Sequence, residues 1–147
     1  MKVYNEKYHF SFEIPDDFEE IAREDYPRYH IDPTTLNIFI KYENDIPHTI
    51  SLNRDDDVKD EKNYMDLMLL NLKNMEKMGM TVTDHIHQTL NSRRVDIVYS
   101  SFKRLKFVTY FTVVRQMMIA CSVEIKEIND ENDQILTKLF ETIQEID

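Results

Sequence analysis

The sequence predicts an α+β fold, in which a mostly antiparallel sheet of about seven strands is flanked by two helices as an α/β/α sandwich. Three observations support this prediction. Seven segments have the residue pattern of β-strands, two have apolar residues at helical spacing, and two of the strands are apolar on both sides. With 147 residues and 41% hydrophobic content, the chain has the size and composition of one globular domain, residues 1–147.

The N-terminal quarter contains the first strand and a long connection. Apolar and polar residues alternate over 8–14, which is the period of a half-buried strand, and Pro15 ends it. Residues 16–25 are expected to form a short helical turn, and residues 26–33 an irregular loop.

Two strands and the first helix come next. The strands are expected at 35–43 and 48–53, where apolar residues again alternate. After Asp57 the apolar residues recur every three or four positions, which predicts an amphipathic helix of roughly five turns. Gly79, the only glycine, follows the last apolar helical position, Met78. We expect it to end the helix in a left-handed conformation.

The rest of the chain reads as a meander of strands followed by a helix. The four strands are predicted at 81–90, 93–102, 105–114 and 117–125. The last two are apolar or small on both sides, so they should be central strands with a helix on each face. Asn91 is expected at positive φ in the first of the three turns, and the other two turns are expected to have wider geometry. The second helix begins near Asn129 or Asp130.

Charge and cysteine content exclude several classes of protein. A formal net charge of −10 repels phosphate backbones, and the basic stretches 92–94 and 102–106 are too short to oppose it, so nucleic acid is excluded as a partner. The single cysteine, Cys121, excludes an intrachain disulfide and favours a reducing compartment. No segment has the apolar length of a signal peptide or a membrane span, so we expect a cytoplasmic protein without a membrane partner.

A contact site is predicted in the connection 24–33. This segment concentrates Tyr26, Arg28, Tyr29 and His30 outside regular structure, and tyrosine and arginine contribute strongly to protein contacts. The alternative is that the segment is a lid packed over the open end of the sheet.

A metal site is the second prediction. His85 and His87 lie two apart on a strand, so their side chains project from one face roughly 6–7 Å apart, and His9 offers a third ligand if the strands are neighbours. The alternative is that both histidines lie on a solvated or partly helix-covered face.

No pattern of residues typical of catalysis is present. Cys121 lies among inward-facing apolar residues, where a thiol behaves as an inert hydrophobic side chain. Phosphate-binding and dinucleotide-binding loops need several glycines, and this chain has one. The methionines Met68, Met75 and Met78 are expected to fill the core beneath the first helix. We therefore expect neither enzymatic activity nor a cofactor.

Two stretches resemble a known family. "YHFSFEIPDDFEEI" resembles the opening of PsbP-like domains, and "FVTYFTVVRQMMIACSVEIKEINDENDQILTKLFETI" is similar to their closing hairpin and final helix. The family includes a photosystem extrinsic protein and the Mog-type Ran-release factors. The resemblance implies an α/β/α sandwich that acts as a non-enzymatic binding or assembly module.

Three functions are compatible with the sequence. The first is an adaptor domain that binds a protein partner through 24–33 and an acidic surface. The second is a metal-binding protein that uses His85 and His87, and the third is a small immunity or antitoxin-like protein. The chain is expected to be a monomer or an edge-strand dimer. An exposed edge strand would allow two copies to pair, whereas charged residues near the edges, such as Lys41 and Glu43, oppose this pairing.

Overall fold

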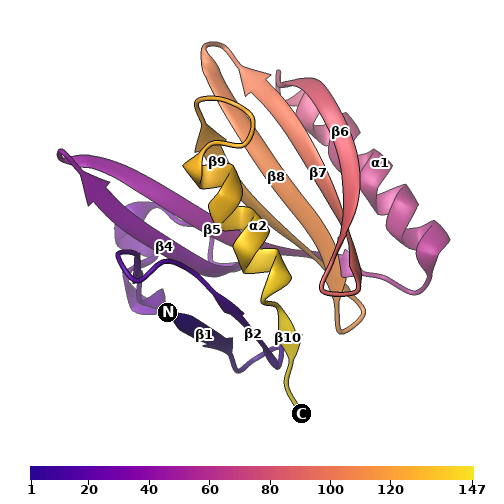
Figure 1. Cartoon of the computed structure of the whole chain (residues 1–147), viewed down its shortest axis with the longest axis horizontal. Helices are drawn as coiled ribbons and strands as arrows, with labels where there is room; N and C mark the ends of the chain where they lie inside the picture. The colour runs from indigo at the N-terminus through magenta and orange to yellow at the C-terminus, as the bar shows by residue number, and fades with distance from the viewer.

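The structure is a computed structural model that describes residues 1–147. Its elements in chain order are β1 (Lys2–Asn5), β2 (Phe10–Glu13), β3 (Glu19–Glu20), the 3-10 turns η1 (Arg23–Asp25) and η2 (Pro27–Tyr29), β4 (Thr35–Glu43), β5 (Ile46–Asp57), α1 (Glu61–Lys77), β6 (Thr81–Leu90), β7 (Arg93–Phe102), β8 (Leu105–Val114), β9 (Met117–Ile125), α2 (Glu131–Glu141) and β10 (Gln144–Glu145) (Figure 1). Neither helix is both long enough and apolar enough to cross a membrane.

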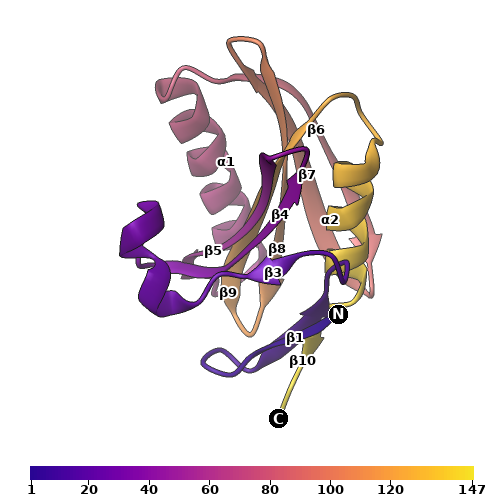
Figure 2. The ribbon, with the colours of Figure 1, turned by 90° about the vertical axis from the view of Figure 1, so that its left-hand side faces the viewer.

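Seven antiparallel strands form the main sheet, in the order β3-β4-β5-β9-β8-β7-β6. The helix α1 covers one face of this sheet and α2 covers the other, which Figure 2 shows with the sheet between them. The predicted α+β sandwich is therefore confirmed.

Hydrophobic packing explains why both helices adhere to the sheet. The central strands β8 and β9 contribute buried residues to both sides, as the sequence predicted: Phe111 and Met118 face α1, whereas Tyr110 and Cys121 face α2. The larger cluster, on the α2 side, contains 25 buried residues and extends to the N-terminal strand, so this side holds most of the core.

The strand expected at 8–14 forms, but its placement in the main sheet was wrong. Strand β2 pairs with β1 and β10 in a separate three-stranded sheet, called here the small sheet. Phe10, Ser11 and Phe12 are all buried, so both sides of β2 are covered. The seventh place in the main sheet belongs to β3, because Glu19 and Glu20 pair with β4. The helical turn expected over 16–25 is therefore limited to η1 at Arg23–Asp25.

The end of α1 confirms the role of Gly79, which has φ +90°. Its N–H donates to the carbonyl of Glu76, and the Met80 N–H donates to the carbonyl of Met75, which closes the helix. The expectation for Met78 was wrong: it is 71% exposed. Met78 follows the last residue of α1 as its C-cap, so it lies outside the helical face that packs on the sheet.

The hairpin turns of the meander are tighter than expected. Asn91 has the predicted positive φ of 51°, and Ser92 also has a positive φ, 61°. Arg115 and Gln116, with φ of 49° and 63°, form the same kind of two-residue turn. Residues 103–104 also connect a directly paired Phe102 and Leu105, so the wider geometry expected for both turns was wrong. Two residues at positive φ match the twist of the flanking strands, and this favours the tight turn even without glycine.

Candidate functional site

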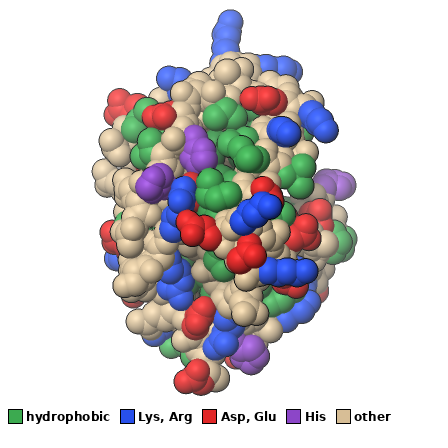
Figure 3. All heavy atoms as spheres, turned by 90° about the vertical axis from the view of Figure 1, so that its right-hand side faces the viewer, with side chains coloured by type: hydrophobic (Ala, Val, Ile, Leu, Met, Phe, Trp, Pro, Cys, Tyr) green, Lys and Arg blue, Asp and Glu red, His purple; other side chains and the backbone are tan.

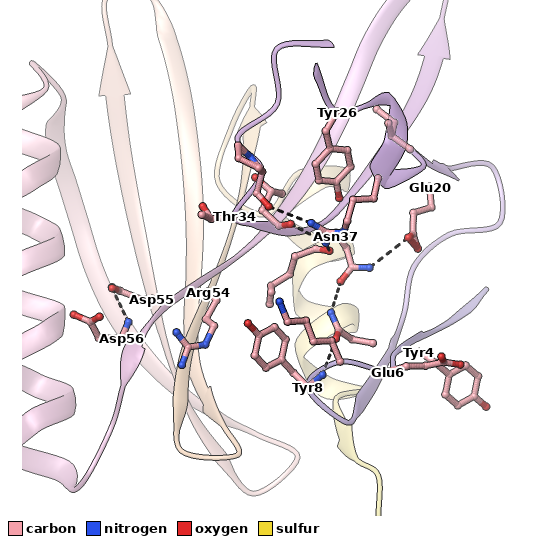
Figure 4. A pocket seen from close by; sticks show the side chains of 17 residues that line it. Tyr4, Glu6, Tyr8, Glu20, Tyr26, Thr34, Asn37, Arg54, Asp55 and Asp56 are labelled. Carbon is pink, nitrogen blue, oxygen red and sulfur yellow. Dashed lines mark hydrogen bonds between the residues drawn. The ribbon is translucent and has the colours of Figure 1, made fainter. Parts of the chain in front are cut away.

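A cleft of about 640 Å³ lies between the β1–β2 hairpin, the segment from β3 to the start of β4, and the end of β5 (Figure 4). Seventeen residues line it, and most are polar: Tyr4, Asn5, Glu6, Lys7, Tyr8, Glu20, Ile21, Arg23, Tyr26, Pro33, Thr34, Thr35, Leu36, Asn37, Arg54, Asp55 and Asp56. The cleft therefore joins the small sheet to one end of the main sheet.

Side-chain amides fix the hairpin against β4. The Asn5 Nδ2 donates to the Asn37 Oδ1 at 3.0 Å, and the Asn5 Oδ1 accepts from the N–H of Tyr8 at 3.0 Å. The Asn37 Nδ2 in turn donates to the Glu20 carboxylate at 3.4 Å. Because both asparagines are buried and paired, this contact holds the floor of the cleft in place.

One wall of the cleft is built around Arg23. Its guanidinium donates to the backbone carbonyls of Pro33, Thr35 and Leu36 at 3.1, 3.1 and 2.8 Å, which ties both ends of the 24–33 segment together. The same guanidinium lies 4.9 Å from the ring centroid of Tyr26. Burial raises the pKa of Tyr26. Its hydroxyl points toward Asn37 in Figure 4.

The opposite wall carries acidic side chains from β5. Asp55 accepts hydrogen bonds from Asn71 of α1 at 2.7 Å and from the N–H of Asp56 at 2.8 Å. The side chains of Asp56 and Glu6 make no hydrogen bond or ion pair within the chain. Two carboxylates are thus available to a ligand.

The basic side chains of the cleft are already engaged. Arg54 forms an ion pair with Asp57 and lies 5.5 Å from the Tyr8 ring centroid, and Lys7 lies 5.3 Å from the same centroid. Four acidic and three basic side chains line the cleft, so their formal charges leave one negative charge in excess.

The four residues predicted as contacts are divided between the core and the surface. Tyr26 is only 3% exposed and belongs to the cleft wall, whereas Arg28, Tyr29 and His30 are exposed. The Arg28 guanidinium lies 5.1 Å from the Tyr29 ring centroid, and His30 ends η2 with a φ of 58°. The segment leaves the cleft wall at Tyr26 and returns to it at Pro33, so these three residues lie beyond its rim.

Sequence reasoning missed the other half of the cleft. Asn5, Glu20, Asn37 and Asp56 come from four separate stretches of the chain and meet only through the pairing of strands. The one available signal was Asn37, a polar residue in an otherwise apolar stretch of strand.

His85 and His87 lie on β6 opposite Val98 and Asp96, so both side chains are on the α1 face of the sheet. The His85 Nε2 lies 2.8 Å from the Asp96 Oδ1, and Asp96 is fully buried. Burial raises the pKa of Asp96, but hydrogen bonds from Tyr64, Arg94 and His85 together lower it below its ordinary value. The expected third ligand, His9, lies in the β1–β2 connection of the small sheet.

Two further predictions concern metal ligands and the thiol. No group of three or more His, Cys, Asp or Glu side chains within the chain is arranged to hold a metal ion. Cys121 is fully buried, and burial raises the pKa of its thiol, as expected of an unreactive cysteine.

No protein-family model matches the sequence, and no curated protein is significantly similar to it. Solved structures do match the fold. The solution structure of cyanobacterial PsbP from Synechocystis sp. PCC 6803 superposes with a TM-score of 0.67 at 9% identity, over 99% of this chain and 91% of that one. The fold is PsbP-like.

Two other solved structures match the fold of this chain with lower TM-scores. A protein from Bacteroides thetaiotaomicron matches with a TM-score of 0.53 at 13% identity, over 99% of this chain and 48% of that one. A Pseudomonas aeruginosa protein of unknown function matches with a TM-score of 0.50 at 16% identity, over 84% of this chain and 78% of that one. At these identities the likeness extends to the fold and not to function.

Proposed function

We propose that this protein is a non-enzymatic binding module that holds a basic segment of a protein partner in the cleft and contacts the partner a second time through Arg28, Tyr29 and His30. The observation that carries the proposal is the pair of unpartnered carboxylates, Glu6 and Asp56, in a cleft whose basic groups are already engaged. The Mog-type part of the sequence resemblance has no support from the comparisons, and the proposal does not depend on it.

Charge supports a basic partner. Lysine or arginine side chains entering the cleft would meet Glu6 and Asp56 and would also be attracted by the net charge of −10. Attraction of this kind is screened by salt, so binding should weaken as ionic strength rises.

Exposed contact residues beside the cleft support the second contact. Tyr29 is 43% exposed and carries the Arg28 guanidinium against its ring, which leaves a flat aromatic and cationic surface in the solvent. Tyrosine and arginine are enriched among the residues that dominate binding energy. Because Arg23 fixes both ends of the segment, little ordering would be needed on binding.

The fold likeness is compatible with this role but adds no ligand. Cyanobacterial PsbP shares the fold at 9% identity, and the Pseudomonas aeruginosa match has no established function. The cytoplasmic location expected from the sequence remains part of the proposal.

The experiment is an affinity pull-down from the native host's lysate, at low and high salt, with mass spectrometry of the retained proteins. We expect a stoichiometric protein partner that is lost at high salt. The variants Glu6→Gln/Asp56→Asn and Arg28→Ala/Tyr29→Ala should each reduce its recovery, while Tyr42→Ala, which removes a tyrosine that is 61% exposed on β4, should not. Tyr26 is left unchanged because its burial makes it part of the fold.

Two outcomes would decide between alternatives. Full recovery by both double variants would contradict the proposed surface. A retained partner that is a basic toxin encoded beside this protein's gene would make the module an immunity protein, which is the special case that the sequence left open.

A further inference from the structure

The edge of the main sheet at β6 is open. Strand β6 pairs only with β7, and its other side has no partner over ten residues. The opposite edge is guarded, because β3 is two residues long and consists of the exposed Glu19 and Glu20. By contrast, the ionisable side chains of β6 are Asp84, His85 and His87, with no lysine or glutamate among them. Charged residues normally protect such edges, and here that protection is nearly absent.

The β6 sequence is complementary to itself when two copies pair antiparallel about Ile86. Asp84 of one copy then lies opposite Gln88 of the second, and His85 lies opposite the second copy's His87. No acidic residue meets another, and the β6–β7 ladder is regular from Asp84 to Leu90, so the strand is not interrupted at these positions.

This register would bring four imidazoles together on the α1 face. His85 and His87 of each copy would form a patch about 5 by 7 Å, and imidazole nitrogens bind Zn²⁺ at about 2.0–2.1 Å in tetrahedral sites. Within one chain only two such ligands are present, and a closed zinc site needs four. A second copy supplies the other two.

The contact between His85 and Asp96 orients the His85 imidazole for binding a metal ion. When the His85 Nε2 carries the proton that it shares with the buried Asp96 at 2.8 Å, the Nδ1 has its lone pair free for a metal. Carboxylate groups that orient a ligating histidine in this way are typical of zinc sites. Tyr64 and Arg94 hold Asp96 in turn, so the orientation of His85 is fixed before any metal binds.

An exposed leucine lies on the same side. The Asn71 side chain donates to Asp55 of β5, so the Asn71 side of α1 faces β5. Leu69, which is 55% exposed, lies on the opposite side of the helix, toward β6. Figure 3 views the molecule from the side of α1 and β6 and shows histidine side chains next to exposed hydrophobic ones. Pairing through β6 would place the two α1 helices on one face of a continuous sheet, beside the junction, where Leu69 would be covered.

From these observations we propose that β6 is a dimerisation strand on which two copies of this chain pair antiparallel about Ile86, bridged by one Zn²⁺-class ion held by His85 and His87 of both copies. This surface is separate from the cleft, so the dimer and the binding of a partner can succeed or fail independently.

Sedimentation and light scattering test the proposal on the metal-free full chain, titrated with ZnCl₂ and then with EDTA. We expect the mass to change from 17.7 kDa to twice that value with one zinc per two chains, and to return with EDTA. Mg²⁺, a hard ion that prefers oxygen ligands, should have no effect. The His87→Ala variant should remain monomeric in zinc. A chain that stays monomeric in zinc, or a dimer that persists after His87→Ala, would overturn the metal-bridged dimer.

Charge variants test the register without touching the histidines. Gln88→Asp would place an aspartate opposite Asp84 at two symmetric positions and should weaken the dimer by about tenfold. Adding Asp84→Lys should restore it. Circular dichroism would confirm that these exposed substitutions leave the fold intact. Equal dimerisation by Gln88→Asp and the native chain would contradict this pairing.

Crosslinking tests the symmetry directly. In the proposed register Ile86 of one chain lies directly opposite Ile86 of the other, at a distance that a disulfide can span. Ile86→Cys should therefore form an interchain disulfide with oxidised glutathione in the presence of zinc. The matched Thr89→Cys variant places the two thiols about 20 Å apart along the strands and should crosslink far more slowly. The native Cys121 is fully buried and does not compete. Equal crosslinking by both variants would rule out pairing about Ile86.

Discussion

The side chains of Asn5 and Asn37 meet across the floor of the cleft, where the Nδ2 of Asn5 donates to the Oδ1 of Asn37 at 3.0 Å. Asn5 belongs to the small sheet and Asn37 to β4 of the main sheet. Both are buried, so a single polar contact sets how the two sheets face each other at this point.

Breaking this contact should destabilise the protein. Asn37→Ala leaves the buried Asn5 amide without its acceptor, and we expect the free energy of unfolding to fall by roughly 1–3 kcal/mol. The measurement is urea denaturation of Asn5→Ala, Asn37→Ala and the double variant. Because the two side chains interact, the double variant should lose less than the two single variants combined. Strictly additive losses would show that the bond contributes nothing.

Arg23 should control the order of the 24–33 segment. Arg23→Lys keeps the charge but cannot reach three carbonyls with a planar group, so the segment should loosen. We expect faster cleavage by chymotrypsin after Tyr29, with little change in overall circular dichroism; the bond after Tyr26 is not cleaved because Pro27 follows it. Arg28→Lys is the control and should be cleaved at the native rate, because Arg28 lies in the same segment and its guanidinium makes no hydrogen bond to the backbone.

Alkaline pH should destabilise the attachment of α2. Burial raises the pKa of Tyr99 and of Tyr110 far above the ordinary value, and both hydroxyls also donate to the buried Asp133, at 2.8 and 2.5 Å. The folded state therefore keeps these protons after the unfolded chain has lost them. The stabilisation is complete below about pH 10 and is lost as the pH rises above it, by about 1.4 kcal/mol per pH unit for each tyrosine.

Urea denaturation between about pH 9 and pH 11 checks this dependence. Tyr99→Phe removes one of the buried tyrosines whose pKa is raised, so its stability should fall less steeply with pH than that of the native chain. Parallel pH profiles for the two proteins would contradict the assignment of this effect to Tyr99.

Substitution of Gly79 should show the strain that a side chain meets at the end of α1. With φ at +90° and the Phe102 ring 3.3 Å from the position a Cβ would occupy, Gly79→Ala should lower the free energy of unfolding by about 1 kcal/mol or more. Gly79→Asn should cost less, since asparagine tolerates left-handed backbone better. Thermal unfolding of both variants gives the comparison, and an alanine variant as stable as the native chain would refute it.

Local patterns in the sequence were sufficient to predict the order of most helices and strands along the chain, but not which sheet each strand joins. The helical spacing before Gly79 and the double-sided apolar strands located α1, β8 and β9, because these signals depend only on nearby residues. The alternation at 8–14 indicated a strand without showing which sheet it joins, since Ser11 is buried by contacts distant in the sequence.

The candidate site was less accessible to sequence reasoning for the same reason. The aromatic composition of 24–33 was visible, but the burial of Tyr26 depends on Arg23 folding back over its ring and onto the strand that follows. The acidic groups of the cleft could not be brought together because Glu6 and Asp56 are fifty residues apart and line the same cleft only when the hairpin docks. Likewise, the partner of His85 proved to be Asp96 on the adjacent strand and not His9.

The tight turns at Asn91–Ser92 and Arg115–Gln116 have a consequence for heat tolerance. Ten residues other than glycine have positive φ, a conformation that glycine would adopt with little strain. A chain with so little glycine has a less flexible unfolded ensemble, which favours folding, while its hairpin tips are held in costly conformations, which opposes it. Exposed tips such as Ser92 and Gln116 are therefore the positions at which laboratory selection for thermostability would find room for improvement without altering the core or the cleft.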